Sequence, residues 1–86
     1  MPSYNLTWKR SAQKELRQLP PAVIKHILHA VEQLATQPYP PGVKKLAGVE
    51  HTYRLRVGDY RLIYSVFGAT LIIEIIRVGH RKDVYR

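Results

Sequence analysis

Three arginines occupy alternating positions on either side of a tight-turn dipeptide. Arg54 and Arg56 precede residues 58–59, which are Gly-Asp, and Arg61 follows them. If these two residues form a hairpin turn, the register places Arg56 directly opposite Arg61, with Arg54 two positions along on the same face. Opposed like charges destabilise a sheet by roughly 0.2–1 kcal/mol. The pattern therefore predicts an anion-binding patch, and the alternative is an arginine-rich face that only keeps the sheet solvated.

A second group of polar residues follows the last apolar stretch of the chain. It comprises Gly79, His80, Arg81 and Lys82, with Tyr85 a few residues further on. A loop at this point can bring His80 and Arg81 to the edge of the arginine patch. Cleavage of a phosphodiester without a metal needs a base for the 2′-hydroxyl, fixed cations around the phosphorane and an acid for the 5′-oxygen. Histidine is the residue type whose ordinary pKa lies near neutral pH, which makes His80 a candidate base, and Tyr85 can act if cations lower its pKa. The alternative for His80 is a plain surface histidine.

Two further clusters are weaker candidates. Arg10, Lys14 and Arg17 form a basic stripe that either extends a nucleic-acid footprint or aids solubility. His26 and His29 lie one helical turn apart, but no third fixed ligand accompanies them. We therefore predict no metal site and no cofactor.

Composition narrows the class of protein. The 86 residues, 45% of them hydrophobic, support a single folded domain spanning residues 1–86. The formal charge of +8 calls for an anionic partner, of which nucleic acid is the commonest; an acidic protein and an anionic membrane are the alternatives, and the charge alone does not choose among them. The absence of cysteine excludes a disulfide framework and a thiolate nucleophile. No signal-peptide or membrane-spanning pattern is present, so we expect a cytoplasmic protein that does not act at membranes.

Periodicity predicts the elements that position these groups. A short strand near residues 4–8 precedes two helices, over 9–19 and from the proline pair at 20–21 to residue 35. After a proline-rich loop, the period changes to two over 53–57, 60–66 and 71–78. The order β-α-α-β-β-β predicts an α+β fold: a small antiparallel sheet of about four strands with both helices on one face. Ile63, Ile72 and Ile76 are predicted on the arginine side, as an apolar patch that a partner segment can bury.

Four stretches match a known family in order and spacing: SAQKEL at 11–16 followed by LP at 19–20, KKLAG at 44–48, YRLRVGDYRLIY at 53–64, and VGHR at 78–81 followed by VY at 84–85. They resemble the RelE/ParE toxins of bacterial and archaeal toxin–antitoxin systems, and the RelE branch in particular. The resemblance spans nearly the whole chain. It implies a small sheet with two N-terminal helices, an endoribonuclease that cuts mRNA in the ribosomal A site, and a cognate antitoxin that wraps and silences the toxin.

The resemblance also implies roles for particular residues. The site residues implied are Arg54, Arg56, Arg61, Arg81 and Tyr85, to which His80 is added for the chemistry of its side chain. The cations assigned to RNA are Lys44, Lys45, Lys82, Arg10, Lys14 and Arg17. Arg54 and Arg56 stand where lysine is common in the family, and because arginine does not lose its proton, the role of general base passes to His80 or Tyr85.

These residues are compatible with two functions. The first is a metal-independent, ribosome-dependent mRNA endoribonuclease, held by an antitoxin in a hetero-oligomer through an acidic, amphipathic segment. The second is a non-catalytic, ParE-like inhibitor of DNA gyrase. A phosphate site needs the arginine face, whereas a gyrase contact does not.

Overall fold

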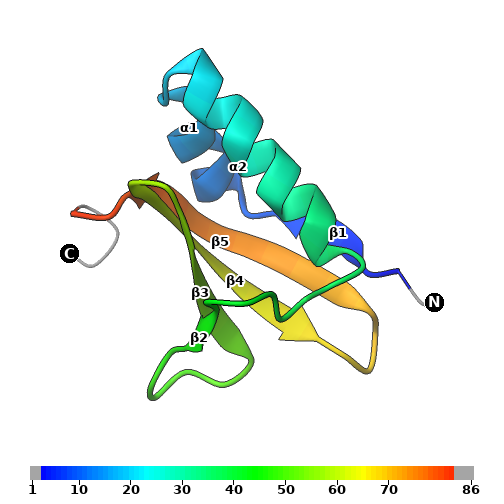
Figure 1. Ribbon diagram of the computed structural model, residues 1–86. Helices are drawn as coiled ribbons and strands as arrows, with labels where there is room; N and C mark the ends of the chain where they lie inside the picture. Colours follow the sequence, from blue (N-terminus) through cyan, green and yellow to red (C-terminus); the bar gives the residue numbers. More distant parts are fainter. Residues whose placement is uncertain (1–2, 83–86) are drawn as a thin grey trace.

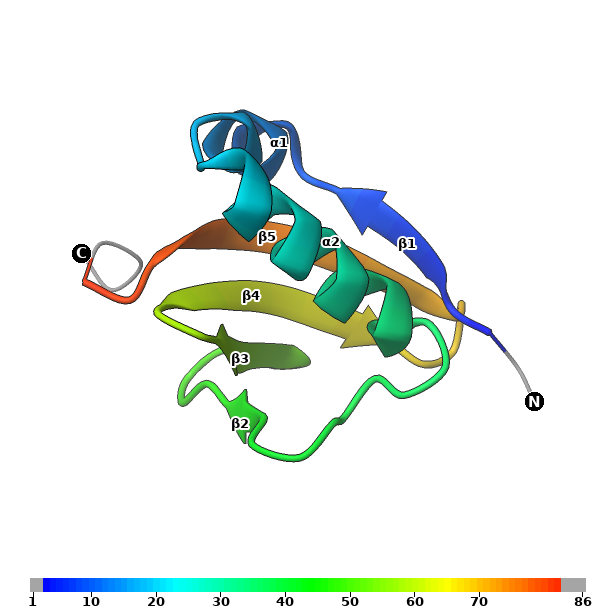
Figure 2. The same cartoon turned by 45° about the horizontal axis from the view of Figure 1, so that its top comes forward.

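The computed structural model describes residues 3–82. Two helices cover one face of a five-stranded sheet (Figure 1 and Figure 2). The elements, in chain order, are β1 (Asn5–Trp8), α1 (Arg10–Arg17), α2 (Pro21–Leu34), β2 (Lys44–Lys45), β3 (Thr52–Val57), β4 (Tyr60–Phe67) and β5 (Ile72–His80). Within residues 3–82, no helix combines the length and apolar character that crossing a bilayer requires.

The sheet has the strand order β1-β5-β4-β3-β2. All neighbours are antiparallel except β1, which runs parallel to β5. The predicted α+β fold, with two N-terminal helices on one face of the sheet, is confirmed, but the sheet is mixed and has five strands rather than about four. The extra strand, β2, pairs Lys44 with Arg54 and Lys45 with Tyr53. Two residues are too few for an alternating pattern to reveal a strand.

The core lies between α2 and the central strands. Ile27, Val31 and Leu34 occupy one stripe of α2 and are at most 2% exposed. They face the sheet residues that alternate onto the same side, among them Leu62 and Tyr64 of β4. Burying each such aliphatic side chain contributes about 1.5–3 kcal/mol, so this contact is the main stabilising layer.

Helix α1 packs along the edge of β5 beyond the point where β1 ends. The Lys9 N–H donates to the carbonyl oxygen of Ile75 at 2.9 Å, and Ala12 is fully buried, which lets the helix approach the strand closely. One turn further on, the Glu15 carboxylate accepts the Val78 N–H at 3.1 Å. A helix side chain thus supplies the acceptor that a neighbouring strand would otherwise provide.

An irregularity in β5 changes which of its residues face the helices. Tyr64 pairs with Ile75, but Ile63 pairs with Arg77, so Ile76 is an extra residue in the ladder. A β-bulge of this kind shifts the alternation by one position. Val78 therefore enters the core, where it is 1% exposed, and Arg77 shares a row with Ile63 on the opposite face.

The loop after α2 is fastened to the sheet by tyrosines. The Tyr64 hydroxyl donates to the carbonyl oxygen of Pro38 at 2.7 Å. The Tyr53 ring lies between those of Tyr64 and Tyr39, with centroid distances of 6.0 and 5.0 Å. Burial raises the pKa of the Tyr64 phenol, and burial together with Tyr53 raises the pKa of Tyr39. Both phenols therefore stay protonated at neutral pH, and the Tyr64 phenol keeps the proton that it donates to Pro38.

We predict that Tyr64→Phe lowers the free energy of unfolding by about 1 kcal/mol at neutral pH, because Pro38 loses its donor. The folded state raises the pKa of Tyr64, so its contribution is complete below about pH 10, the pKa in the unfolded chain, and is lost as the pH rises above that value. Urea unfolding at neutral and at strongly alkaline pH should show a smaller alkaline loss for Tyr64→Phe than for the wild type. Tyr60→Phe on the same strand is the control, and equal alkaline losses in Tyr64→Phe and the wild type would contradict the prediction.

Candidate phosphate-binding site

The hairpin register predicted from the sequence is confirmed. Arg56 pairs with Arg61 across β3 and β4, and Gly79 of β5 lies on the other side of Arg61. Gly58, the first turn residue, has φ = +61°, in the left-handed region that hairpin turns of two residues require and that glycine adopts without strain. This turn fixes all the arginines of β3 and β4 on the sheet face away from the helices.

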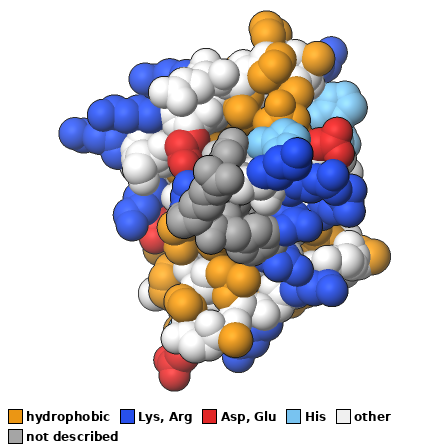
Figure 3. Space-filling model, turned by 90° about the vertical axis from the view of Figure 1, so that its left-hand side faces the viewer, with side chains coloured by type: hydrophobic (Ala, Val, Ile, Leu, Met, Phe, Trp, Pro, Cys, Tyr) orange, Lys and Arg blue, Asp and Glu red, His pale blue; other side chains and the backbone are white. Residues whose placement is uncertain are grey.

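The next row across the sheet adds more positive charge. It runs through Lys44, Arg54, Ile63 and Arg77. Since neighbouring strands are about 4.8 Å apart and the two rows lie two residues, or about 6.6 Å, apart along the strands, they form one compact surface. We call it the arginine face; its cations are Lys44, Arg54, Arg56, Arg61 and Arg77. Figure 3 looks onto the end of the sheet that carries the β3–β4 turn and shows Lys and Arg side chains gathered beside histidine side chains.

Contacts within the fold hold several of these guanidinium groups in place. The Arg56 Nε donates to the carbonyl oxygen of Gly58 at 2.8 Å, and the Arg61 Nε is buried. The Arg77 Nη2 lies 3.3 Å from the Glu15 Oε2, with the Arg77 side chain 37% exposed. Guanidinium groups in fixed positions suit a phosphate, which they bind through paired, planar hydrogen bonds.

Arg81 joins this end of the sheet through its backbone. Its N–H donates to the carbonyl oxygen of Asp59 at 3.0 Å, so the segment after β5 lies against the β3–β4 turn. The side chain is exposed. This contact brings Arg81 close in space to the row that holds Arg56 and Arg61, as the sequence predicts.

His80 lies at the same end of the sheet but on the helix side. It pairs with Tyr60, and the two rings meet edge to face with centroids 5.5 Å apart. Both residues line a hollow that also includes Leu19 and Pro20. The His80 Nδ1 accepts the Lys82 N–H at 3.3 Å, which leaves the proton of the neutral ring on Nε2. The imidazole is thus turned away from the arginine face, and its other ring nitrogen is a donor.

The remaining predicted RNA-binding residues lie around this site rather than in it. Lys45 is exposed on the edge strand β2, and Lys82 is exposed after β5. Arg10, Lys14 and Arg17 lie along the polar side of α1. Tyr85 lies outside the described residues. No group of three or more His, Asp or Glu side chains within residues 3–82 is arranged to hold a metal ion.

The isoleucine patch predicted on the arginine side is less open than the sequence indicates. Ile63 is only 9% exposed and lies between Arg54 and Arg77, whose aliphatic stems flank it. Ile72 and Ile76 are half-buried. A pattern of alternation does not show how much of an apolar side chain its long neighbours cover.

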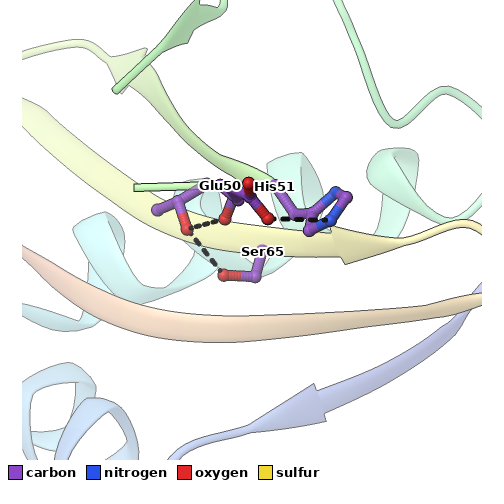
Figure 4. Close-up of polar contacts among 4 residues, drawn as sticks. Glu50, His51 and Ser65 are labelled. Carbon is purple, nitrogen blue, oxygen red and sulfur yellow. Dashed lines mark hydrogen bonds and ion pairs between the residues drawn. The ribbon is translucent and has the colours of Figure 1, made fainter. Parts of the chain in front are cut away.

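A Ser, a His and a Glu approach one another at the far end of β3, but they do not form a catalytic triad (Figure 4). The Ser65 hydroxyl is 3.0 Å from the Thr52 hydroxyl, which also contacts the carbonyl oxygen of Glu50 at 3.0 Å. The His51 ring meets the Glu50 carboxylate at 3.9 Å, and both of these side chains are mostly exposed. The buried hydroxyl pair is a structural contact that joins β3 to β4.

Sequence reasoning missed Arg77 and Glu15 as parts of the site. Arg77 reaches the arginine face only because of the bulge at Ile76, which no residue type announces. The one signal in the sequence was Glu15, a carboxylate within a helix that is otherwise basic on its polar side. Such an isolated acid often marks a specific cationic partner.

Known proteins resemble this chain in both sequence and fold. Residues 6–85 match a family model described as the ParE toxin of type II toxin–antitoxin systems. The toxin RelG of Mycobacterium tuberculosis is 30% identical over 84 residues, covering 96% of this chain and 97% of RelG. Among solved structures, the RelE–RelB complex of Pyrococcus horikoshii matches with a TM-score of 0.83 and 32% identity, over 95% of this chain and 99% of that one. Isolated Escherichia coli RelE matches with a TM-score of 0.80 and 28% identity, over 96% and 92%.

The fold is the one found in solved RelE toxins. The chain belongs to the RelE/ParE superfamily of toxins from type II toxin–antitoxin systems.

We predict that added sodium chloride raises the free energy of unfolding of the wild type more than that of Arg56→Gln, by roughly a few tenths of a kcal/mol, because salt screens the like-charge pair with Arg61 that the variant lacks. The variant also loses the hydrogen bond from Arg56 to Gly58, so the salt dependence, and not the stability at one salt concentration, reports on the pair. Urea unfolding at low and high salt tests this. Arg17→Gln, at the C-terminal end of α1 where the helix dipole favours a cation, is the control and should not reduce the gain that salt gives. An equal gain with salt in Arg56→Gln and the wild type would show that the pair is not repulsive.

Proposed function

We propose that this toxin is a metal-independent, ribosome-dependent mRNA endoribonuclease of the cytoplasm. The observation that carries the proposal is the arginine face, in which Arg54, Arg56 and Arg61 crowd together despite their mutual repulsion. Such crowding is compensated when a phosphate occupies the face. The similarity to RelE toxins supports the same activity.

In this mechanism, Arg54, Arg56 and Arg61 hold the scissile phosphate. A base takes the proton of the 2′-hydroxyl, the O2′ attacks phosphorus, and the bond from phosphorus to O5′ breaks. Arg81 stabilises the departing O5′ or donates the proton that this oxygen gains. The products carry a 2′,3′-cyclic phosphate and a 5′-hydroxyl, so no water enters the first step.

The arginines act on the transition state rather than on the proton. Charge accumulates on the equatorial phosphoryl oxygens as the phosphorane forms, and donors fixed in advance stabilise it without reorganising. One such donor typically contributes about 3–4 kcal/mol. Arg77, held by Glu15, adds a further positive charge at the margin of the same face.

The general base is His80 or Tyr85. His80 would first have to release the Lys82 N–H from its Nδ1 and turn toward the phosphate, since its Nε2 carries the proton in the neutral ring. In the conformation described, the Nε2 of His80 donates a hydrogen bond and cannot take up the proton of the 2′-hydroxyl. Tyr85 would need a lowered pKa, which guanidinium groups beside a phenol would favour.

Surrounding cations would guide the RNA to the site. Lys44 lies in the same row as Arg54, and Lys45 and Lys82 are exposed nearby. The α1 stripe of Arg10, Lys14 and Arg17 extends the positive surface beyond β5. Contacts of this kind bind phosphates and ribosomal RNA without reading sequence.

A second candidate is inhibition of DNA gyrase by a non-catalytic, ParE-like toxin. The match to a ParE family model favours it. A gyrase inhibitor would not depend on Arg61 or Arg81 as a phosphate-binding pair, so substitution of these residues separates the two functions.

We also propose that a cognate antitoxin covers the arginine face, as part of a toxin–antitoxin hetero-oligomer. The similarity to a RelE solved together with RelB supports such a partner. An acidic, amphipathic segment fits the surface, with carboxylates meeting the arginines and apolar side chains meeting the exposed parts of Ile72 and Ile76.

The first test is the double substitution Arg61→Ala and Arg81→Ala. It should abolish growth inhibition while the thermal unfolding midpoint stays close to that of the wild type, because neither side chain belongs to the core. Mapping the 5′ ends of cellular mRNA after brief induction should show cuts in phase with codons for the wild type and none for the double variant. Lys25→Ala, on the exposed side of α2, is the matched control and should remain toxic.

Three outcomes would contradict the mechanism. A double variant that stays fully toxic at equal expression would show that the phosphate site is wrongly assigned. Fragments with 5′-phosphate ends would indicate hydrolysis instead of attack by the 2′-hydroxyl. Intact mRNA together with stalled replication would indicate gyrase as the target.

The partner surface can be tested by hydrogen exchange on the toxin with and without its antitoxin. We expect exchange to slow in β3, β4 and β5, where the arginine face lies. A segment whose carboxylates are replaced by amides is the control and should protect these strands less. Protection confined to the opposite side, around His26, His29 and Glu32, would contradict the assignment.

A further inference from the structure

An aromatic side chain outside the core stands exposed near the β2 edge of the sheet, resting on a strand residue that faces the helix side. Tyr39 is 51% exposed, although most tyrosines of this fold are half-buried or buried. It lies in the loop between α2 and β2, which runs along the β2 edge of the sheet in Figure 2. Its ring rests edge to face on Tyr53 of β3, at 5.0 Å and 66°.

The loop that carries Tyr39 is held rigidly. The Tyr64 hydroxyl binds the carbonyl oxygen of the preceding residue, Pro38, at 2.7 Å. On the other side, the Val43 N–H donates to the carbonyl oxygen of Pro40 at 3.1 Å, which closes a turn with Gly42 at φ = +87°. Proline followed by glycine in this geometry is a type II turn. The ring is therefore fixed before any ligand arrives, which lowers the entropy lost on binding.

Positive charge connects Tyr39 to the arginine face. Tyr53, which supports the Tyr39 ring, pairs with Lys45, so both lie on the helix side of the sheet. The adjacent pair, Lys44 and Arg54, lies on the arginine face. The two lysines thus stand on opposite sides of a two-residue edge strand, and both are exposed. A polyanion can pass from the arginine face over this edge to Tyr39 without leaving positive charge.

We infer that Tyr39, supported by Tyr53 and flanked by Lys45, is a stacking subsite for one unpaired nucleobase of the RNA that the arginine face holds. The inference rests on the proposed function and extends its substrate contact around the edge of the sheet. Aromatic rings beside a basic track are the usual means of binding single-stranded nucleic acid without reading its sequence. An isolated ring on a rigid loop suits a flat base better than it suits a peptide helix, which needs a longer apolar groove.

Binding of an octameric, 2′-O-methylated single-stranded RNA to the purified full chain tests the inference, because the methyl groups prevent cleavage. A second octamer with the same backbone but abasic positions supplies the phosphates alone. We expect Tyr39→Ala to weaken binding of the first octamer roughly 5- to 150-fold and to leave binding of the abasic octamer unchanged. Tyr39→Phe keeps the ring and should bind as the wild type does. The thermal unfolding midpoint of each variant is measured as well, and a midpoint equal to that of the wild type shows that the variant is folded.

The Arg61→Ala variant separates this inference from the proposed function. If Arg61→Ala weakens binding of both octamers and Tyr39→Ala weakens neither, the stacking subsite is wrong and the phosphate site stands. If Tyr39→Ala weakens only the base-containing octamer and Arg61→Ala weakens neither, the subsite stands and the phosphate site fails. Equal losses of Tyr39→Ala on both octamers, or no measurable binding by the wild type, overturn the inference. So does a Tyr39→Ala variant that binds RNA normally but no longer binds its antitoxin.

Discussion

The two-residue turn between β3 and β4 is the constraint on which the rest of the molecule depends. It sets the register in which Arg56 faces Arg61, and hence the face on which every neighbouring side chain of the two strands lies. A slip by one residue would exchange the faces, bringing guanidinium groups under α2 and leucines to the surface. Because burying an unpaired charge is far more costly than the surface repulsion between two arginines, the observed register is the one that gives a stable core. Core and site are thus specified by the same few residues.

The mutually repelling arginines lie on the surface of a well-packed domain. Helix α1 contributes to the packing through Ala12, which lies against β5. It contributes to the site through Glu15, which binds the Val78 N–H and the Arg77 guanidinium. One carboxylate thereby completes the ladder of β5 and partly balances the charge of the arginine face. The remaining cations keep most of their field, which an incoming anion meets in an arrangement already formed.

The parts of the structure that local rules govern are those the sequence could predict. The helix of Ile27 and Val31 follows from its apolar stripe, and the pairing of Arg56 with Arg61 follows from turn length. The face of His80 could not be predicted, because the bulge at Ile76 resets the alternation of β5, and a bulge depends on how three strands and a helix pack together. The parallel pairing of β1 was also out of reach, since it joins segments from opposite ends of the chain. Placement within the site therefore needed the structure, whereas the chemical types of its residues did not.

The parallel pair of β1 and β5 also has a consequence for biosynthesis. Strand β1 can pair only after β5 has been made, because β5 lies between β1 and β4 in the sheet. Nearly the whole described chain must therefore be present before the sheet can form completely. Contacts this distant in sequence make folding slow compared with that of a helical protein of similar size. While β5 is still inside the ribosome, Arg77, Gly79 and Arg81 cannot join the sheet. The arginines of the β3–β4 hairpin then have no completed sheet beside them. Because of this strand order, the complete basic surface forms only after most of the chain has been translated.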